Sequence, residues 1–304
     1  MKIVVAGGSG FIGSKLIQRL TEDKNEIVLL TRRQKIISRT QNDLIKTVQW
    51  DGKTLGNWVE YVDGSDVVIN LSGENIANKR WSKEQKLKLF QSRTEPTKAI
   101  INAIANAKQK PKLLINASAS GYYGYDSKDI ITESYSKGTG FLAELCLSWE
   151  QAALEAEKNN VRVILIRTGI VLDPNQGALK KMILPYKFFV GGPLGSGKQW
   201  FPWIHIDDVI NIIIFVLKND KLSGAINVSS PQPITMREFS KKLGKAIRRP
   251  SWISVPSFAL KILLGEMSAM LIGGLQMIPK KLIDNGFVFK YSNIDDALNN
   301  LLRK

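Results

Sequence analysis

A glycine-rich turn between two apolar segments constrains the fold of this chain more than any other feature. Residues 2–6 (KIVVA) and 26–30 (EIVLL) are apolar, β-branched runs typical of buried parallel strands. Between them lie the turn GGSGFIG, residues 7–13, and a segment with apolar side chains at helical spacing. A strand, a glycine turn, a helix and a strand in this order predict the first unit of a dinucleotide-binding fold.

The glycines of the turn fit two spacings of the dinucleotide-binding motif. Gly8, Gly10 and Gly13 satisfy G-x-G-x-x-G, and Gly7 in place of Gly8 satisfies the looser G-x-x-G-x-x-G. The first glycine of the motif permits a tight turn, the middle one lets a pyrophosphate approach the backbone, and the third permits close helix packing. The helix N-terminus then offers free N–H groups to the phosphates. The predicted cofactor-binding residues of the turn are Gly7, Ser9, Gly10, Phe11, Ile12 and Gly13; a tight turn without a ligand is the alternative.

The residues after the second strand predict which dinucleotide binds. NAD-binding proteins usually place Asp or Glu there to hold the ribose 2′-hydroxyl. This chain has Arg32 and Arg33 instead. Guanidinium groups bind a 2′-phosphate by charge-assisted hydrogen bonds, whereas a carboxylate would repel it. We therefore predict NADP(H) rather than NAD(H), with two solvated surface arginines as the alternative.

Apolar runs and helical segments alternate along most of the chain. This alternation predicts an α/β fold, a doubly wound parallel sheet of the Rossmann type, followed by a small, mostly helical C-terminal domain. The predicted boundaries are residues 1–227 for the dinucleotide-binding domain, about 170–204 for a substrate-loop insertion within it, and 248–297 for the C-terminal domain. Further strands are expected within 66–73, 112–118, 161–169 and 225–228, and helices within 82–108, 141–158 and 235–247.

Composition limits the partners that this chain can have. Although the net charge is +16, the excess of basic residues is six, four and six in residues 1–100, 101–200 and 201–304, so nucleic-acid binding is not expected. One histidine and one cysteine predict no metal site and no intrachain disulfide, which suits the cytoplasm. The longest apolar stretch, 260–278, is interrupted by charged residues, and no membrane partner is expected. A small-molecule substrate is expected, and a homodimer stays open.

The only histidine and the only cysteine are expected to be packed residues. His205 precedes Asp207 and Asp208, either of which could cap the helix that follows. We expect His205 to be packed beside that cap, with a general-base role as the alternative. Cys146 lies in a helical segment and is expected to fill space rather than to act as a nucleophile.

Short motifs spread along the whole chain carry a family resemblance. They are GGSGFIG at 7–13, NLSGE at 70–74, KRW at 79–81, ASASGYYG at 117–124, FLAE at 141–144, RTGIVL at 167–172, GPLGSG at 192–197, WIHIDD at 203–208 and PKKL at 279–282. With them the chain resembles the extended short-chain dehydrogenase/reductase superfamily of sugar-nucleotide epimerases and dehydratases. It is most similar to an atypical branch, the "epimerase family", which ends in a small domain of unassigned function. The resemblance implies further cofactor contacts by Leu71, Ser72, Gly73, Arg93, Ala117 and Thr168.

The chain departs from this superfamily at its catalytic pair. The superfamily uses Tyr-x-x-x-Lys, in which the lysine lowers the tyrosine pKa, but none of the seven tyrosines here has lysine four positions later. Leu142 and Cys146 stand near the expected positions, and Ala119 occupies the usual serine position between two other serines. The cofactor motif is therefore intact while the usual acid/base pair is absent.

Three functions stay open at this stage. The first is an NADP(H)-dependent oxidoreductase or epimerase with a substitute acid, the second a non-catalytic NADP(H)-binding regulatory or scaffolding module, and the third a nucleic-acid-binding protein on a Rossmann scaffold. The alternative for each candidate residue is a surface carboxylate or a tyrosine that only walls the pocket. The candidate catalytic residues are Ser118, Tyr122, Tyr123 and Glu74, with Glu144 as a further carboxylate.

Cations and large aromatic residues follow several predicted strands. Because open α/β sheets bind ligands at the carboxyl ends of their strands, these residues are expected to line one substrate pocket. Such a lining suits a ring-bearing or anionic substrate, for example a sugar nucleotide or a carboxylate. The candidate substrate-binding residues are Lys79, Arg80, Trp81, Trp200 and Trp203.

Overall fold

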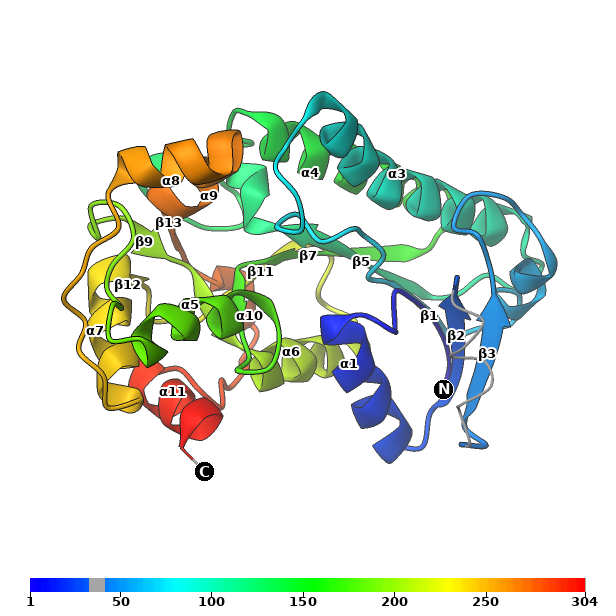
Figure 1. The fold of residues 1–304 in the computed structure, drawn as a ribbon. Helices are drawn as coiled ribbons and strands as arrows, with labels where there is room; N and C mark the ends of the chain where they lie inside the picture. Colours follow the sequence, from blue (N-terminus) through cyan, green and yellow to red (C-terminus); the bar gives the residue numbers. More distant parts are fainter. Residues whose placement is uncertain (33–41, 304) are drawn as a thin grey trace.

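Seven parallel strands form the centre of the protein, which is described by a computed structural model for residues 1–32 and 42–303 (Figure 1). The strand order is β11-β7-β5-β4-β1-β2-β3, so the chain starts in the middle of the sheet and crosses over β1 to build the second half. This is the predicted doubly wound topology. The strands are β1 (Lys2–Ala6), β2 (Glu26–Thr31), β3 (Ile45–Gln49), β4 (Val67–Asn70), β5 (Leu113–Ala119), β7 (Arg162–Thr168) and β11 (Gly224–Val228).

Helices cover both faces of the sheet because successive strand side chains point to opposite faces. Ile3 and Val5 of β1 pack in one hydrophobic cluster with α1 and α6, whereas Val4 and Ala6 pack in another with α3 and the end of α4. Figure 1 shows these two helix layers below and above the sheet. The helices are α1 (Phe11–Glu22), α6 (Ile206–Lys218), α3 (Lys83–Asn106) and α4 (Phe141–Leu154).

The remaining strands and helices gather beside the β11 edge of the sheet (Figure 1). The strands are β6 (Asp126–Ile131), β8 (Ile170–Leu172), β9 (Trp200–Phe201), β10 (Trp203–His205), β12 (Ile234–Thr235) and β13 (Gly274–Met277). The helices are α5 (Gly177–Lys187), α7 (Met236–Ala246), α8 (Ser257–Leu264), α9 (Ala269–Ile272), α10 (Lys280–Asp284) and α11 (Ile294–Leu302). Short 3₁₀ turns lie at η1 (Asn57–Tyr61), η2 (Ser120–Tyr123), η3 (Glu155–Asn159) and η4 (Gly265–Ser268).

The C-terminal segment is mostly helical, as predicted, but it is woven into the rest of the molecule. Its strand β13 pairs in parallel with β6, a pairing that the sequence analysis did not anticipate. Its side chains join three different hydrophobic clusters: Leu282 packs under the main sheet, Leu298 packs against α7, and Met277 packs beside Tyr123. The segment therefore shares its hydrophobic core with the preceding residues, and its boundary at residue 248 stays a prediction. Within the described residues, no helix is both long and apolar enough to cross a membrane.

The helix α6 begins at the only histidine of the chain. Contrary to the expectation for Asp207 and Asp208, the N-cap is His205 itself, whose Nδ1 accepts the backbone N–H of Asp207 at 3.0 Å. The ring stacks on Tyr291 with centroids 3.9 Å apart, and Nε2 lies 3.2 Å from Oδ1 of Asn300. The Asp208 carboxylate instead accepts backbone N–H groups from the chain entering α11. His205 is thus a packed structural residue, as expected, and burial lowers its pKa to about 4.

This histidine makes stability depend on pH. Between about pH 6.5 and about pH 4 the unfolded chain binds a proton that the folded protein excludes, so the free energy of unfolding should fall as pH drops through this range. The loss should reach about 3 kcal/mol. His205→Asn keeps a capping oxygen but does not titrate, and should lose this part of the pH dependence. Urea unfolding of both proteins at about pH 7 and about pH 4.5 measures how much the free energy of unfolding changes with pH. An equal change in the two proteins would show that His205 is not the source of this pH dependence.

Candidate functional site

The glycine turn lies at the carboxyl end of β1 and touches the chain after β4. Gly7 has φ +76°, and a Cβ atom there would lie 2.5 Å from the carbonyl carbon of Leu71. A Cβ on Gly13 would lie 2.5 Å from the Gly7 carbonyl oxygen, so the third glycine packs α1 against the turn itself. A Cβ atom on Gly8 would lie 2.4 Å from Cδ1 of the Ile17 side chain, so the core leaves little room for one. The backbone angle therefore identifies Gly7 as the turn glycine and supports the looser of the two spacings.

The middle glycine faces open space. A Cβ on Gly10 would meet only the Gly7 carbonyl oxygen, at 3.2 Å, and Gly10 is the N-cap of α1 without a side-chain capping bond. The first turn of α1 contains no acidic residue, and Ser9 is exposed beside it. Phe11 and Ile12, the first two helical residues, are half-buried. A helix start of this kind binds a phosphate group through its backbone N–H groups and partial positive charge.

The end of β2 presents a cation beside the glycine turn. Arg32 directly follows β2, is exposed, and has no ion-pair partner within the described part of the chain. β2 is the neighbour of β1 in the sheet, so Arg32 leaves the sheet on the same edge as the turn. Arg33, predicted as a second cofactor contact, lies outside the described residues.

Five of the remaining predicted cofactor contacts, here called the floor of the site, lie on or after β4, β5 and β7, on the other side of β1. Ser72 and Leu71 are half-buried after β4, Gly73 is exposed, and the Ser72 N–H donates to Oδ1 of Asn70. Ala117 on β5 and Thr168 on β7 are half-buried at the same edge. The structure thus gathers these candidates, with the turn, at the carboxyl ends of β1, β4, β5 and β7, where open α/β sheets bind ligands.

Arg93 supports this floor from below. Its guanidinium donates to the carbonyl oxygens of Glu74 (2.9 Å) and Leu89 (3.0 Å) and stacks on Trp149. A Cβ on Gly73 would lie 3.2 Å from the guanidinium carbon. Burial lowers the pKa of Arg93. The residue therefore holds the loop after β4 in place, with its cation directly beneath Gly73.

A buried polar network occupies the carboxyl ends of β5, β7 and β11. The strand register places Ser118, Arg167 and Asn227 side by side across these three strands. Arg167 forms a two-bond ion pair with Glu150 of α4, with N–O distances of 2.9 and 2.8 Å, and both side chains are about 5% exposed. The Ser118 hydroxyl donates to the same carboxylate at 2.6 Å. Burial disfavours the Arg167 cation, but its bonds with Glu150 outweigh this and raise its pKa.

Two tyrosines contact the Arg167 guanidinium in different ways. The Tyr123 hydroxyl accepts a hydrogen bond from Arg167 at 2.9 Å and donates one to Asn227 at 2.7 Å. Burial raises the pKa of Tyr123 to about 12 despite the nearby cation, so its phenol stays protonated. The ring of Tyr122 lies over the guanidinium, 3.5 Å from its carbon, and is only half-buried. The Tyr122 hydroxyl has no hydrogen-bond partner among the residues that the structure describes.

Most of this network was not predicted from the sequence. Glu150 and Asn227 were not candidates, and Arg167 entered only as part of a motif. Glu133 was also missed: its carboxylate accepts the backbone N–H groups of Asn227 (3.0 Å) and Lys281 (3.2 Å), which ties the C-terminal segment to the site. A signal was present, because Glu150 directly follows the mostly apolar run 145–149 and Arg167 directly follows the apolar run 163–166.

Two other candidates, Glu74 and Glu144, have structural partners, and Cys146 is packed as expected. The Glu74 carboxylate accepts a hydrogen bond from the Gln85 side chain at 2.9 Å, which agrees with the alternative that Glu74 is not catalytic. Glu144 is exposed and pairs with Lys137. Cys146 is buried, burial raises its pKa to about 12, and it is therefore a packed residue rather than a nucleophile. Among the described residues, no group of three or more metal-ligating side chains is found.

The loop before α3 carries three of the five substrate candidates. Lys79 is exposed, and Arg80 is exposed but donates to the carbonyl oxygen of Ile262 in α8 at 3.2 Å. Trp81 is half-buried and packs edge-on against Phe141 with ring centroids 5.2 Å apart. These contacts place the loop between α4 and α8.

The two remaining tryptophans differ in accessibility. Trp200, on β9, is half-buried. Trp203 is 0% exposed within the cluster of α5, α7 and α11, so the expectation that it contacts a substrate is not supported. Its strand, β10, pairs with β8, and the side chain packs in this core.

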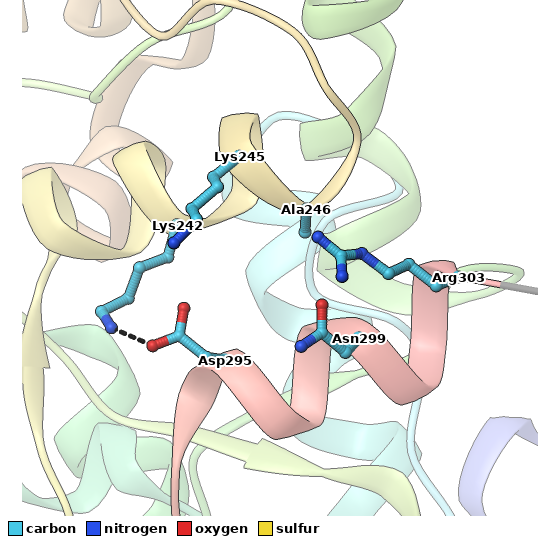
Figure 2. Close-up of a pocket in the computed structure, with 6 residues that line it drawn as sticks. All are labelled: Lys242, Lys245, Ala246, Asp295, Asn299 and Arg303. Carbon is cyan, nitrogen blue, oxygen red and sulfur yellow. Dashed lines mark hydrogen bonds and ion pairs between the residues drawn. The ribbon is translucent and has the colours of Figure 1, made fainter.

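Two surface cavities lie apart from these residues. One, of about 170 Å³, lies between α7 and α11 (Figure 2). Figure 2 shows Lys242 of α7 paired with Asp295 of α11, with Lys245 beside Lys242 on α7 and Arg303 directly after α11. The other, of about 240 Å³, lies between α1 and α6. Neither is lined by a candidate site residue.

Comparison with known proteins agrees with this geometry. The model of the NAD dependent epimerase/dehydratase family matches residues 3–229, and a model described as a domain of unknown function (DUF1731) matches residues 255–301. The chain belongs to the NAD dependent epimerase/dehydratase family. Both the predicted resemblance and the predicted Rossmann fold are thereby confirmed.

Individual relatives cover the chain from end to end. It is 40% identical over 308 residues to the chloroplastic epimerase family protein SDR39U1 homolog of Arabidopsis thaliana, covering all of this chain and 87% of that protein. It is 38% identical to epimerase family protein SAR0825 of Staphylococcus aureus, covering 99% of both. The crystal structure of human epimerase family protein SDR39U1 (isoform 2) with NADPH has a TM-score of 0.90, at 30% identity and full coverage of both chains.

A second solved structure is similar at lower coverage. The nucleoside-diphosphate sugar epimerase from Corynebacterium glutamicum has a TM-score of 0.80 and 28% identity, and the match covers 99% of this chain and 58% of that one.

The buried ion pair of the network generates a stability prediction. Arg167→Met leaves the Glu150 carboxylate buried without its cation and should lower the free energy of unfolding by about 3–5 kcal/mol. The double variant Arg167→Met/Glu150→Leu removes both charges and should lose less than the single variant. Lys280→Ala breaks an exposed pair with Asp284 and should cost at most about 0.5 kcal/mol. Urea unfolding measures the free energy of unfolding of all three variants. The prediction would be refuted if Arg167→Met were at least as stable as the double variant.

Proposed function

We propose that the protein is an NADP(H)-dependent oxidoreductase of the epimerase family that acts on a small carbonyl or alcohol substrate. One observation carries the proposal: the Tyr122 hydroxyl, which has no partner among the described residues, and the Arg167 cation lie at the carboxyl ends of the strands, as the glycine turn does. The edge thus combines a place for a dinucleotide with a proton donor and a fixed positive charge.

The residues present fit NADP(H). The space in front of Gly10 would take the pyrophosphate, and the N-terminus of α1 would bind its charge. Arg32 would hold the 2′-phosphate, with Arg33 as a second proposed contact. Ala117 and Thr168 would lie along the nicotinamide half, beyond Leu71, Ser72 and Gly73. The human relative was crystallised with NADPH, which supports this choice.

The chain's own residues would move the proton. When bound, the cofactor supplies or accepts a hydride. Tyr122 would donate a proton to the substrate oxygen in reduction, and the guanidinium 3.5 Å from its ring would stabilise the negative charge that develops on the phenol oxygen. Arg167 would therefore supply the positive charge that lysine supplies in the usual pair. The Tyr123 and Ser118 hydroxyls are committed to Asn227 and Glu150, so they would position Arg167 rather than react.

The substrate would enter beside the loop before α3. Lys79 and Arg80 would attract an anionic group, and Trp81 and Trp200 would pack against a ring. A nucleoside-diphosphate sugar has both features, and one similar structure is a nucleoside-diphosphate sugar epimerase. Glu74 would act only through the loop that it holds by its bond to Gln85.

A specific observation keeps the non-catalytic module as the second candidate. The polar network is buried and hydrogen-bonded, and the usual lysine is absent, so the network could serve to rigidify an NADP(H)-binding surface. For either function we propose a cytoplasmic location, since the only cysteine is buried and the chain needs no disulfide bond. The Arabidopsis relative is named as chloroplastic.

The cofactor proposal predicts a preference between two dinucleotides. NADPH should bind at least about tenfold more tightly than NADH, because one charge-assisted contact of Arg32 is worth about 1.5–3 kcal/mol. Arg32→Ala should erase most of this preference, while Arg19→Ala, another exposed arginine, should keep it. Gly10→Val should abolish binding of both cofactors in a folded protein. Tryptophan fluorescence titration measures the affinities; equal binding of NADH and NADPH by the wild type would overturn the proposal.

The proton-donor proposal predicts the effect of one hydroxyl. A panel of carbonyl compounds is first screened for NADPH oxidation, and nucleoside-diphosphate sugars, which are alcohols, are screened for NADP+ reduction. With an active substrate, Tyr122→Phe should lower kcat by about a hundredfold or more and leave NADPH affinity unchanged. Tyr135→Phe removes a hydroxyl bound to Ser127 and Asp129 and should keep kcat. Full activity of Tyr122→Phe would disprove the donor, and tight NADPH binding without turnover of any compound would favour the non-catalytic module.

A further inference from the structure

Large apolar side chains are exposed in two segments of the chain. Of fifteen such exposed residues among those described, nine lie within residues 184–190 and 252–263. Isolated exposed apolar residues are normal, but a concentration of them marks an interaction surface. The nine are Leu184, Phe188, Phe189, Val190, Trp252, Ile253, Phe258, Ile262 and Leu263.

The ends of α5 and α7 join five of these residues into one surface. The Trp252 indole N–H donates to the Phe189 carbonyl oxygen at 2.7 Å, and the Trp252 backbone N–H donates to Gly191 at 3.0 Å. The Arg249 guanidinium lies 4.7 Å from the centre of the Phe189 ring. We call this the aromatic–basic surface; it consists of Phe188, Phe189, Val190, Trp252 and Ile253 with Lys187, Arg248 and Arg249.

Two residues of this surface, Phe189 and Arg248, have strained backbone conformations while their side chains are exposed. Phe189 (φ 61°) and Arg248 (φ 54°) are two of four non-glycine residues with positive φ in the described chain. Each directly follows the last turn of its helix, where the next residue donates back to that turn: Val190 to Pro185, and Arg249 to Gly244. Glycine is preferred at this position because a side chain costs free energy there. Phe189 is nevertheless 53% exposed, so little burial offsets the strain.

The charge around this surface has one sign. Residues 174–206 contain four lysines and no acidic residue, and residues 239–265 contain six lysines and arginines and no acidic residue. The sequence as a whole is nearly two-fifths acidic among its charged residues, so these two stretches are exceptional. Lys245, which lines the cavity of Figure 2, adds a further cation one turn before Arg248.

We propose that the aromatic–basic surface binds the surface of an anionic lipid bilayer. Phenylalanine and tryptophan side chains insert at the boundary between headgroups and acyl chains, and lysine and arginine bind the anionic headgroups. A second copy of this chain fits less well, since a symmetric contact would bring the same cations together. The expectation of no membrane partner rested on the lack of a spanning segment, which an interfacial surface does not require.

Vesicle co-sedimentation tests the proposal. The full chain is mixed with extruded vesicles of phosphatidylcholine alone or of phosphatidylcholine with phosphatidylglycerol. The protein should bind the anionic vesicles far more strongly than the neutral ones and dissociate at high salt. Each cation at such a surface contributes about fivefold to partitioning, so Arg248→Gln/Arg249→Gln should weaken binding about 25-fold.

One variant separates lipid binding from folding. Phe189→Gly keeps the carbonyl that accepts from Trp252 and relieves the strained φ, so it should reduce vesicle binding with an unchanged or higher melting temperature. Leu87→Ser, on α3 outside the surface, is the control and should bind like the wild type. Absence of vesicle binding, or equal binding of Phe189→Gly, would overturn the proposal. A concentration-dependent dimer that Phe189→Gly disrupts would assign the surface to self-association instead.

Discussion

The two-bond ion pair between Arg167 and Glu150 fixes the arrangement of the sheet edge on which the site depends. Two opposite charges are buried together, and each is satisfied by hydrogen bonds, so neither strand β7 nor helix α4 can shift without exposing an unpaired charge. Ser118 and Tyr123 take their positions from this pair, and Tyr122 lies over its cation. The pair thus links strand β7 and helix α4 to both candidate tyrosines.

Much of the fold could be predicted from the sequence because its signals are local. Apolar runs and helical spacing identified the strands and helices around the sheet, and the glycine turn identified where the crossover begins. The strand β6 was missed since its residues are mostly polar and its partner, β13, lies near the other end of the chain. The cap of α6 was misassigned because aspartate is a common N-cap, whereas here the imidazole of His205 accepts the bond.

The part of the site that could be predicted from the sequence also depends on local signals. Residues that follow strands could be placed at one edge of the sheet, and Gly10, Ser72 and Tyr122 lie there. Which of two neighbouring tyrosines is committed to the core depends on contacts with Asn227, more than a hundred residues later, and no local pattern contains this information. Likewise, Trp203 and Trp81 look alike in the sequence, but only the first is enclosed by α5, α7 and α11.

The bonds between the C-terminal segment and the network have a consequence for biosynthesis. Asn227 donates to the carbonyl of Ile278, and the Lys281 N–H donates to Glu133, so the last part of the chain completes the surroundings of Arg167. A nascent chain can form the main sheet before these residues leave the ribosome, but the polar groups awaiting them stay unpaired until then. The surroundings of Arg167 are therefore complete only once residues 278–281 are in place, and chains truncated before them would lack these bonds.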